Sequence, residues 1–378
     1  MGSIITNHED LIHDIAYDHY GRLLATCSSD QYVRVFSRKS AADSWAFVSA
    51  TLAHERNVLA LTFAPPQFGT LLATCSEDQS VRIFYSSNDG KSFSRVATLS
   101  DSSGAVHKIA FAKFGGHGLK LASIGTDSVI RVYHAADPSD LKQWHLAFEY
   151  VVDTGSKIKP LDMQSSFSVA WCPAGVAVLP SLSNSYNNED TMEDLPGRIG
   201  ALEISERAIE QFAVAAMSRV AIFRKRYNKS TSESSGQYAF GECEELPGHE
   251  DLVRDVAWAS SAAAGGRYEL IATACKDGYV RIFKLTPRLS HAEDDSTPTG
   301  DIEYDIELAA SFDDHHGEVW KVSWNASGMV LSSSGDDGHV RFWRANFRGE
   351  WIGIGALSAE QGRSTDGNED GDGEDVDS

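Results

Sequence analysis

The sequence predicts an all-β chain folded as a six-bladed propeller, and three observations support this prediction. A thirteen-residue phrase with an aspartate in its turn recurs along the chain, at intervals of roughly 50 residues. Each phrase is preceded by one short strand pattern and followed by another, so each unit holds four strands. Repeated four-stranded units are typical of propeller blades and not of helical solenoids. Five copies cover residues 24–36, 72–84, 121–133, 271–283 and 331–343, and a weaker copy of twelve residues without the aspartate covers 212–223.

The first strand of each unit precedes the phrase. Its apolar residues alternate with other residues and the segment ends on an aromatic residue. This period-two pattern predicts a strand with one side against a core. The six segments are 12–17, 58–63, 106–111, 166–171, 253–258 and 319–324.

The phrase supplies the second and third strands, and a fourth strand follows it, for example over 45–52 or 351–357. The fourth copy of the phrase diverges most, because Ala221 stands where the other five copies have arginine. We expect residues 1–357 to form one propeller domain. Its expected blades are approximately 8–52, 54–99, 101–152, 162–246, 249–312 and 315–357.

Four stretches within or after the blades are polar. The segments 181–197, 228–241 and 288–301 are rich in Ser, Asn, Asp and Gly, which predicts surface loops. Residues 366–377 carry seven acidic residues and no basic one. A segment with almost nothing apolar to bury does not fold by itself, so we expect a disordered acidic tail over 358–378.

Composition and charge exclude several functions. The net charge of −21 argues against direct nucleic-acid binding, which needs a basic surface. No apolar run approaches the roughly 18 residues of a membrane-spanning helix, so we expect no direct membrane insertion. The five cysteines include no Cys-x-x-Cys pair, and no nucleotide or hydrolase motif is present. We therefore expect a protein that is not an enzyme and has no cofactor and no metal.

A histidine stands nine residues before the strand aromatic in four units, each with a turn aspartate in the following phrase. A buried His–Asp hydrogen bond would satisfy both groups and fix the loop. A catalytic dyad or a metal site is the other interpretation. Four symmetric copies favour the structural one, because an active site is normally a single place. The expected pairs are His8 with Asp30, His54 with Asp78, His249 with Asp277, and His315 with Asp337.

The last unit has its own outer strand at 351–357, which leaves residues 3–6 over. The residues alone permit two rings: one closed by 3–6 against the last blade, and one open between the first and sixth blades. An open strand edge is a liability unless another chain covers it. The open form predicts a partner-blade edge at Ser3, Ile4, Ile5, Thr6, Trp351, Ile352 and Ile354.

The repeated pattern of a histidine, a strand and then S-x-D-x-x-V-R-V-F/W resembles the WD-repeat family of β-propellers, although no copy ends in Trp-Asp. Within that family, residues 8–36 resemble the opening blade of the Sec-thirteen and Seh-one propellers. Residues 315–347 resemble their final blade, and the segments 137–150 and 249–259 point the same way.

The resemblance implies a non-catalytic scaffold subunit of the Y-shaped, outer-ring complex of the nuclear pore, located at the nuclear envelope. It implies an open six-bladed propeller that is completed by a blade from an α-solenoid nucleoporin of the Nup-eighty-five type, beside other subunits of that complex. It also implies a second role in a coat-like nutrient-signalling complex at the vacuolar or lysosomal membrane.

Three alternatives stay open, because function depends on sites and not on the propeller fold alone. The first is a vesicle-coat subunit like Sec-thirteen. The second is a WD-repeat peptide reader such as a ubiquitin-ligase substrate receptor. The third is a propeller hydrolase, which would need one asymmetric acid–base cluster at the channel.

Overall fold

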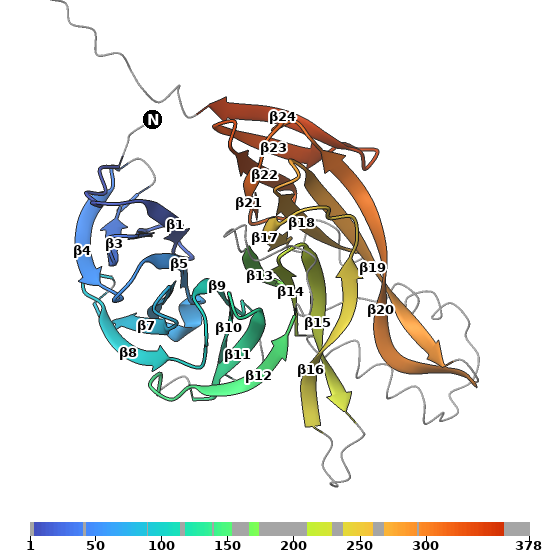
Figure 1. The fold of residues 1–378 in the computed structure, drawn as a ribbon, viewed down its shortest axis with the longest axis horizontal. Coiled ribbons are helices and arrows are strands. Elements are labelled where there is room, and N and C mark those ends of the chain that lie inside the picture. The colour runs from blue at the N-terminus through green and yellow to red at the C-terminus, as the bar shows by residue number, and fades with distance from the viewer. Residues whose placement is uncertain are drawn as a thin grey trace, which may run out of the picture.

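The computed structural model confirms the all-β, six-bladed propeller. Six four-stranded sheets surround a common centre, and the described part of the chain contains one short 3-10 turn, at Pro66–Phe68 (Figure 1). The structure describes residues 4–40, 43–88, 90–113, 118–137, 140–152, 166–173, 210–228, 237–259, 268–292 and 295–358.

The first three blades follow one another along the chain, and each consists of four consecutive antiparallel strands. Blade one contains β1 (Ile12–Tyr17), β2 (Leu23–Ser28), β3 (Tyr32–Ser37) and β4 (Ala46–Leu52). Blade two contains β5 (Val58–Phe63), β6 (Thr70–Ser76), β7 (Val81–Ser86) and β8 (Ser94–Leu99). Blade three contains β9 (Val106–Phe111), β10 (Leu119–Gly125), β11 (Val129–Ala135) and β12 (His145–Val151).

The last three blades repeat this order. Blade four contains β13 (Phe167–Trp171), β14 (Gln211–Ala216), β15 (Arg219–Asn228) and β16 (Gln237–Leu246). Blade five contains β17 (Val253–Trp258), β18 (Glu269–Cys275), β19 (Val280–Ala292) and β20 (Asp295–Phe312). Blade six contains β21 (Val319–Trp324), β22 (Val330–Gly335), β23 (His339–Ala345) and β24 (Trp351–Ser358).

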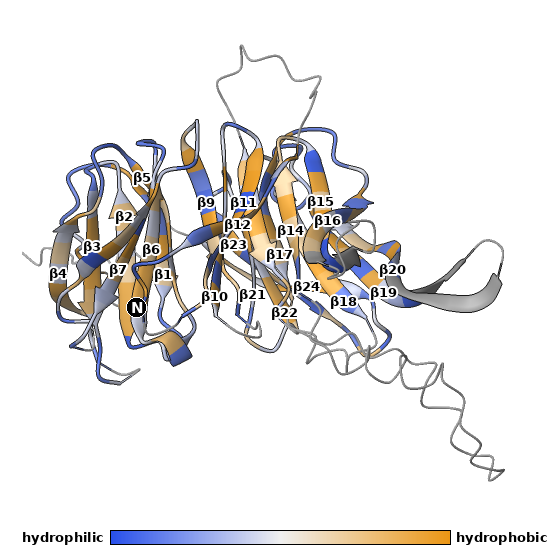
Figure 2. Cartoon of the chain, turned by 90° about the horizontal axis from the view of Figure 1, so that it is seen from below, coloured by the Kyte–Doolittle hydropathy of each residue, from blue (hydrophilic) through white to orange (hydrophobic). Residues whose placement is uncertain are grey.

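The hydrophobic core lies between the blades. Buried apolar side chains form five clusters, which join blade one to two, two to three, three to four, four to five, and five to six. In Figure 2 the apolar colour follows the strands, whereas the described connecting loops are largely hydrophilic. Within the described residues, no such cluster joins blade six to blade one.

The polar stretches differ in part from expectation. The prediction of a loop over 288–301 is wrong, because β19 continues to Ala292 and β20 begins at Asp295, with Arg288 paired to Glu303. Backbone pairing extends this hairpin, and polar composition does not prevent such pairing. Asn228 and residues 237–241 also belong to strands. The predicted loop at 181–197 and residues 359–378 of the predicted tail lie outside the described residues, whereas Ser358, the first residue of that tail, is the last residue of β24.

Candidate functional site: the gap between blades one and six

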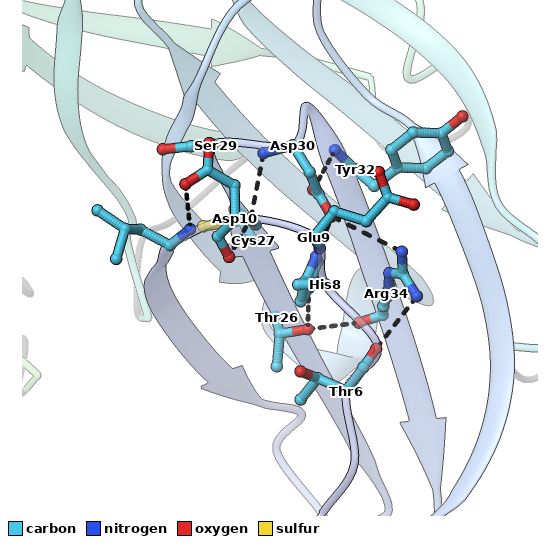
Figure 3. A network of polar contacts seen from close by, with 12 residues as sticks. Thr6, His8, Glu9, Asp10, Thr26, Cys27, Ser29, Asp30, Tyr32 and Arg34 are labelled. Carbon is cyan, nitrogen blue, oxygen red and sulfur yellow. Dashed lines mark hydrogen bonds and ion pairs between the residues drawn. The ribbon is translucent and has the colours of Figure 1, made fainter.

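Blade six has its own outer strand, β24, and no strand from the described part of the N-terminal segment joins it. Residues 4–8 form no strand, and Nη1 of Arg34 donates to the carbonyl oxygen of Thr6 at 3.2 Å (Figure 3). This contact holds the N-terminal segment against blade one. In Figure 1 the first and last blades are neighbours around the ring, yet their ribbons stay apart.

One face of blade one lacks a covering blade. Ile15 lies two residues before the aromatic end of β1 and is 53% exposed, and Ile12 and Tyr17 of the same strand are also exposed. The residue at the position of Ile15 is at most 4% exposed in every other blade. Those five residues are Leu61, Ile109, Val169, Val256 and Val322.

The opposite wall of the gap belongs to blade six. Val340 of β23 is 37% exposed, whereas the residue at its repeat position is at most 3% exposed in the other blades. Phe342, two residues further along β23, is half-buried, and Leu357 of β24, which pairs with Val340, is exposed. The five buried counterparts of Val340 are Val33, Val81, Ile130, Val220 and Val280.

The residues predicted for the partner-blade edge fall in different surroundings. Ile352 and Ile354 of β24 are exposed. Trp351 is half-buried, and its ring lies 5.5 Å from that of Trp324 in the cluster shared with blade five. Ile4, Ile5 and Thr6 lie outside any strand, with Ile5 exposed; Ser3 lies outside the described residues.

The sequence predictions do not include the face residues Ile12, Ile15, Tyr17, Val340 and Phe342. They are apolar, as are nearly all the residues at the same positions of the other blades, so apolar character alone does not distinguish them. Only their position in the chain could have identified them. They belong to the first and last units of a ring whose described first and last blades share no strand.

Three of the four predicted His–Asp pairs are hydrogen bonded, each inside its own blade. In blade one, Nδ1 of His8 lies 2.7 Å from Oδ2 of Asp30, and Nε2 lies 2.8 Å from the Thr26 hydroxyl (Figure 3). The corresponding imidazole–carboxylate distances are 2.9 Å for His54 with Asp78 and 2.9 Å for His315 with Asp337. The rings are buried, so these contacts satisfy groups that water does not reach.

The fourth predicted pair does not form this hydrogen bond. His249 bonds to Thr273 through Nε2 at 2.9 Å, but its buried Nδ1 has no hydrogen-bond partner. Arg281 holds the Asp277 carboxylate instead, at 2.8 and 3.1 Å. Burial and the Arg281 charge lower the pKa of His249 to about 4, so the ring is neutral at pH 7.

The turn aspartates also fix the backbone between the second and third strands. The residue after the aspartate has a positive φ, for example 71° at Gln31 and 67° at Gln79, which residues other than glycine rarely adopt. The aspartate offsets this strain because its carboxylate accepts from the N–H two residues on, as Asp30 does from Tyr32 at 3.0 Å. In blades one, two and six the histidine is thus bonded to the aspartate of this turn.

The described residues contain no group of three His, Cys, Asp or Glu side chains placed to bind one metal ion. The polar His–Asp contacts are spread over separate blades and do not converge on one reaction centre. No helix in the described part of the chain combines the length and apolar character needed to cross a membrane.

The fold and a family model define the class of protein. The model described as "WD domain, G-beta repeat" matches residues 2–37, 47–84, 241–284 and 306–344. The chain is therefore a WD-repeat β-propeller, as the repeated pattern predicts.

Full-length relatives define the family within that class. Nucleoporin SEH1 of Saccharomyces cerevisiae is 33% identical, over 94% of this chain and 99% of the relative. Nucleoporin seh1 of Schizosaccharomyces pombe is 35% identical, over 95% and 96%, and Nucleoporin SEH1 of Homo sapiens is 33% identical, over 94% and 87%. The chain belongs to the nucleoporin SEH1 family, which makes it a structural protein and not an enzyme.

Proposed function

We propose that this chain is a scaffold subunit of the nuclear pore that binds its partner in the gap between blades one and six. One observation carries the proposal: a position that a neighbouring blade buries in five blades is 53% exposed at Ile15. The family name of the relatives supports the location at the pore. The acidic net charge agrees with a protein partner in preference to nucleic acid.

The partner in this proposal is an α-solenoid nucleoporin of the Nup-eighty-five type, which inserts a blade beside other subunits of the Y-shaped complex. The exposed residues lie on the faces of blades one and six, so the inserted blade would pack face to face with both. Burial of apolar surface contributes about 25 cal/mol per Å², so covering Ile15, Tyr17 and Val340 would favour binding. The open edge of β24 with Ile352 and Ile354 would border the same site.

A matched pair of charge substitutions tests this site. Ile15→Asp places a carboxylate on the gap face, and Leu308→Asp places one on the outer strand of blade five, where Leu308 is 52% exposed. Binding of the co-expressed solenoid nucleoporin should weaken at least tenfold for Ile15→Asp, because burying an unpaired carboxylate is costly. Leu308→Asp should bind as the wild type does. Equal binding by all three chains would contradict the proposed site.

Imaging of the tagged chain tests its place in the cell. We expect a nuclear-rim signal that Ile15→Asp weakens and Leu308→Asp preserves. A further signal at the vacuolar or lysosomal membrane would support the second, coat-like role, and a signal confined to vesicle coats would favour a role like that of Sec-thirteen.

A further inference from the structure

The innermost strands carry a charge pattern that the repeat itself does not require. The position three residues before the terminal aromatic holds two acidic and two basic residues among its six copies. Acidic and basic members alternate around the ring, separated in two places by a small residue. In chain order the six residues are Asp14, Ala60, Lys108, Ser168, Asp255 and Lys321.

The two lysines meet at one carboxylate. Nζ of Lys321 donates to Oδ1 of Asp14 at 2.8 Å, and Nζ of Lys108 lies 3.6 Å from Oδ2 of the same residue. The Asp14 side chain is buried, and burial alone would raise its pKa. The charges of Lys108 and Lys321 outweigh burial and lower the pKa of Asp14, so this group is ionised.

The second carboxylate belongs to the same group of charges. Asp255 accepts hydrogen bonds from the Ser168 hydroxyl at 2.7 Å and from the Val322 N–H at 3.3 Å. Burial would lower the pKa of Lys108, and the charges of Asp14 and Asp255 raise it instead. The centre of the ring therefore holds two positive and two negative charges that stabilise one another.

The contacts of Asp14 indicate the width of the gap. Lys108 reaches this carboxylate from blade three, past blade two, whose residue at this position is Ala60. Lys321 reaches the same carboxylate from blade six, past the gap. The same type of side chain thus spans one blade on one side of Asp14 and the gap on the other.

We propose that Lys321, Asp14 and Lys108 form an axial clamp that ties blade six to blade one and holds the inner end of the gap at about the width of one blade. The described apolar clusters join all the remaining pairs of neighbouring blades, but none of them joins blade six to blade one. The clamp replaces that missing contact at the centre and leaves the outer part of the gap open. The clamp is a property of the free chain, without a partner. An experiment can therefore refute the clamp without refuting the proposed partner binding, and an experiment can refute partner binding without refuting the clamp.

Hydrogen–deuterium exchange of the full chain without a partner tests the clamp. Lys321→Met and Asp14→Asn each remove one side of the contact, and their double variant completes a mutant cycle. Lys284→Met is the matched control, because it removes an ion pair of 3.3 Å to Glu307 inside blade five. We expect β1 and β21 to exchange about two- to fivefold faster in both single variants, and no faster in the double variant than in the more affected single one.

Two further results decide the outcome. Lys321→Arg keeps the positive charge, so its β1 and β21 should exchange at the wild-type rate. This comparison remains valid even if Asp14→Asn does not fold. Exchange in Lys321→Met equal to that in Lys284→Met, or single effects that multiply in the double variant, would overturn the clamp.

Discussion

Blade one and blade three contain the same residue at the same repeat position, with opposite surroundings. Ile109 in blade three is buried by blade two, whereas Ile15 in blade one faces the gap and is 53% exposed. The strands around them have the same length and the same antiparallel pairing. A blade therefore folds with or without a neighbour on one face, and the neighbour decides whether that face is core or surface.

The largest expected contrast comes from shortening these two isoleucines. Ile109→Ala should lower the free energy of unfolding by about 2 to 4 kcal/mol, because it removes buried methyl groups and leaves a cavity. Ile15→Ala should lower it by less than about 1 kcal/mol, since most of that side chain already contacts solvent. Urea unfolding of both variants measures the difference. Equal losses would mean that another part of the chain covers Ile15.

An interior interface also buries polar groups, as the contact between blades four and five demonstrates. The Glu269 carboxylate accepts from Nε1 of Trp258 at 2.9 Å and from Nε2 of Gln211 at 3.0 Å. Tyr304 of β20 contacts the same amide at 2.8 Å. Burial raises the pKa of Glu269 to about 7, from its ordinary value of 4.5.

This shift predicts a pH dependence of stability. Below about pH 4.5 Glu269 is protonated in both the folded and the unfolded chain. As the pH rises towards 7, the unfolded chain releases the proton first, so the folded state loses stability. Glu269→Gln stays neutral and should be more stable than the wild type at pH 8 by about 2 kcal/mol, with little difference at pH 4.5. Urea unfolding across this range checks the sign, and a difference independent of pH would contradict it.

A smaller contrast tests the other wall of the gap. Val81→Thr introduces a hydroxyl into the core between blades two and three and should cost about 1 to 2 kcal/mol. Val340→Thr places the same hydroxyl on the gap face of blade six, and its effect should stay within about 0.5 kcal/mol. Thermal unfolding of the two variants measures the contrast. A comparable loss at Val340 would indicate that blade six is covered.

Most of the fold could be predicted from the repeat. Its copies defined the strands, the blades and the turn aspartates, because each blade uses the same side chains for the same purpose. The absence of the His249–Asp277 bond could not be predicted, because blades one, two and six also have an arginine at the position of Arg281 and there the histidine does bind the aspartate. The gap faces could not be predicted residue by residue either, because Ile15 and Ile109 differ in their neighbours and not in type.

Hydroxyl-radical footprinting of the free chain tests the open ring most directly, because it reports the solvent exposure of individual side chains. The oxidation rates of Ile15 and Tyr17, each divided by the intrinsic reactivity of its residue type, should match that of the exposed Leu308. The corresponding rates of Ile109, Val169 and Val256 should be much lower. Protection of Ile15 to the level of Ile109 in the free chain would mean that the ring is closed and would contradict the account.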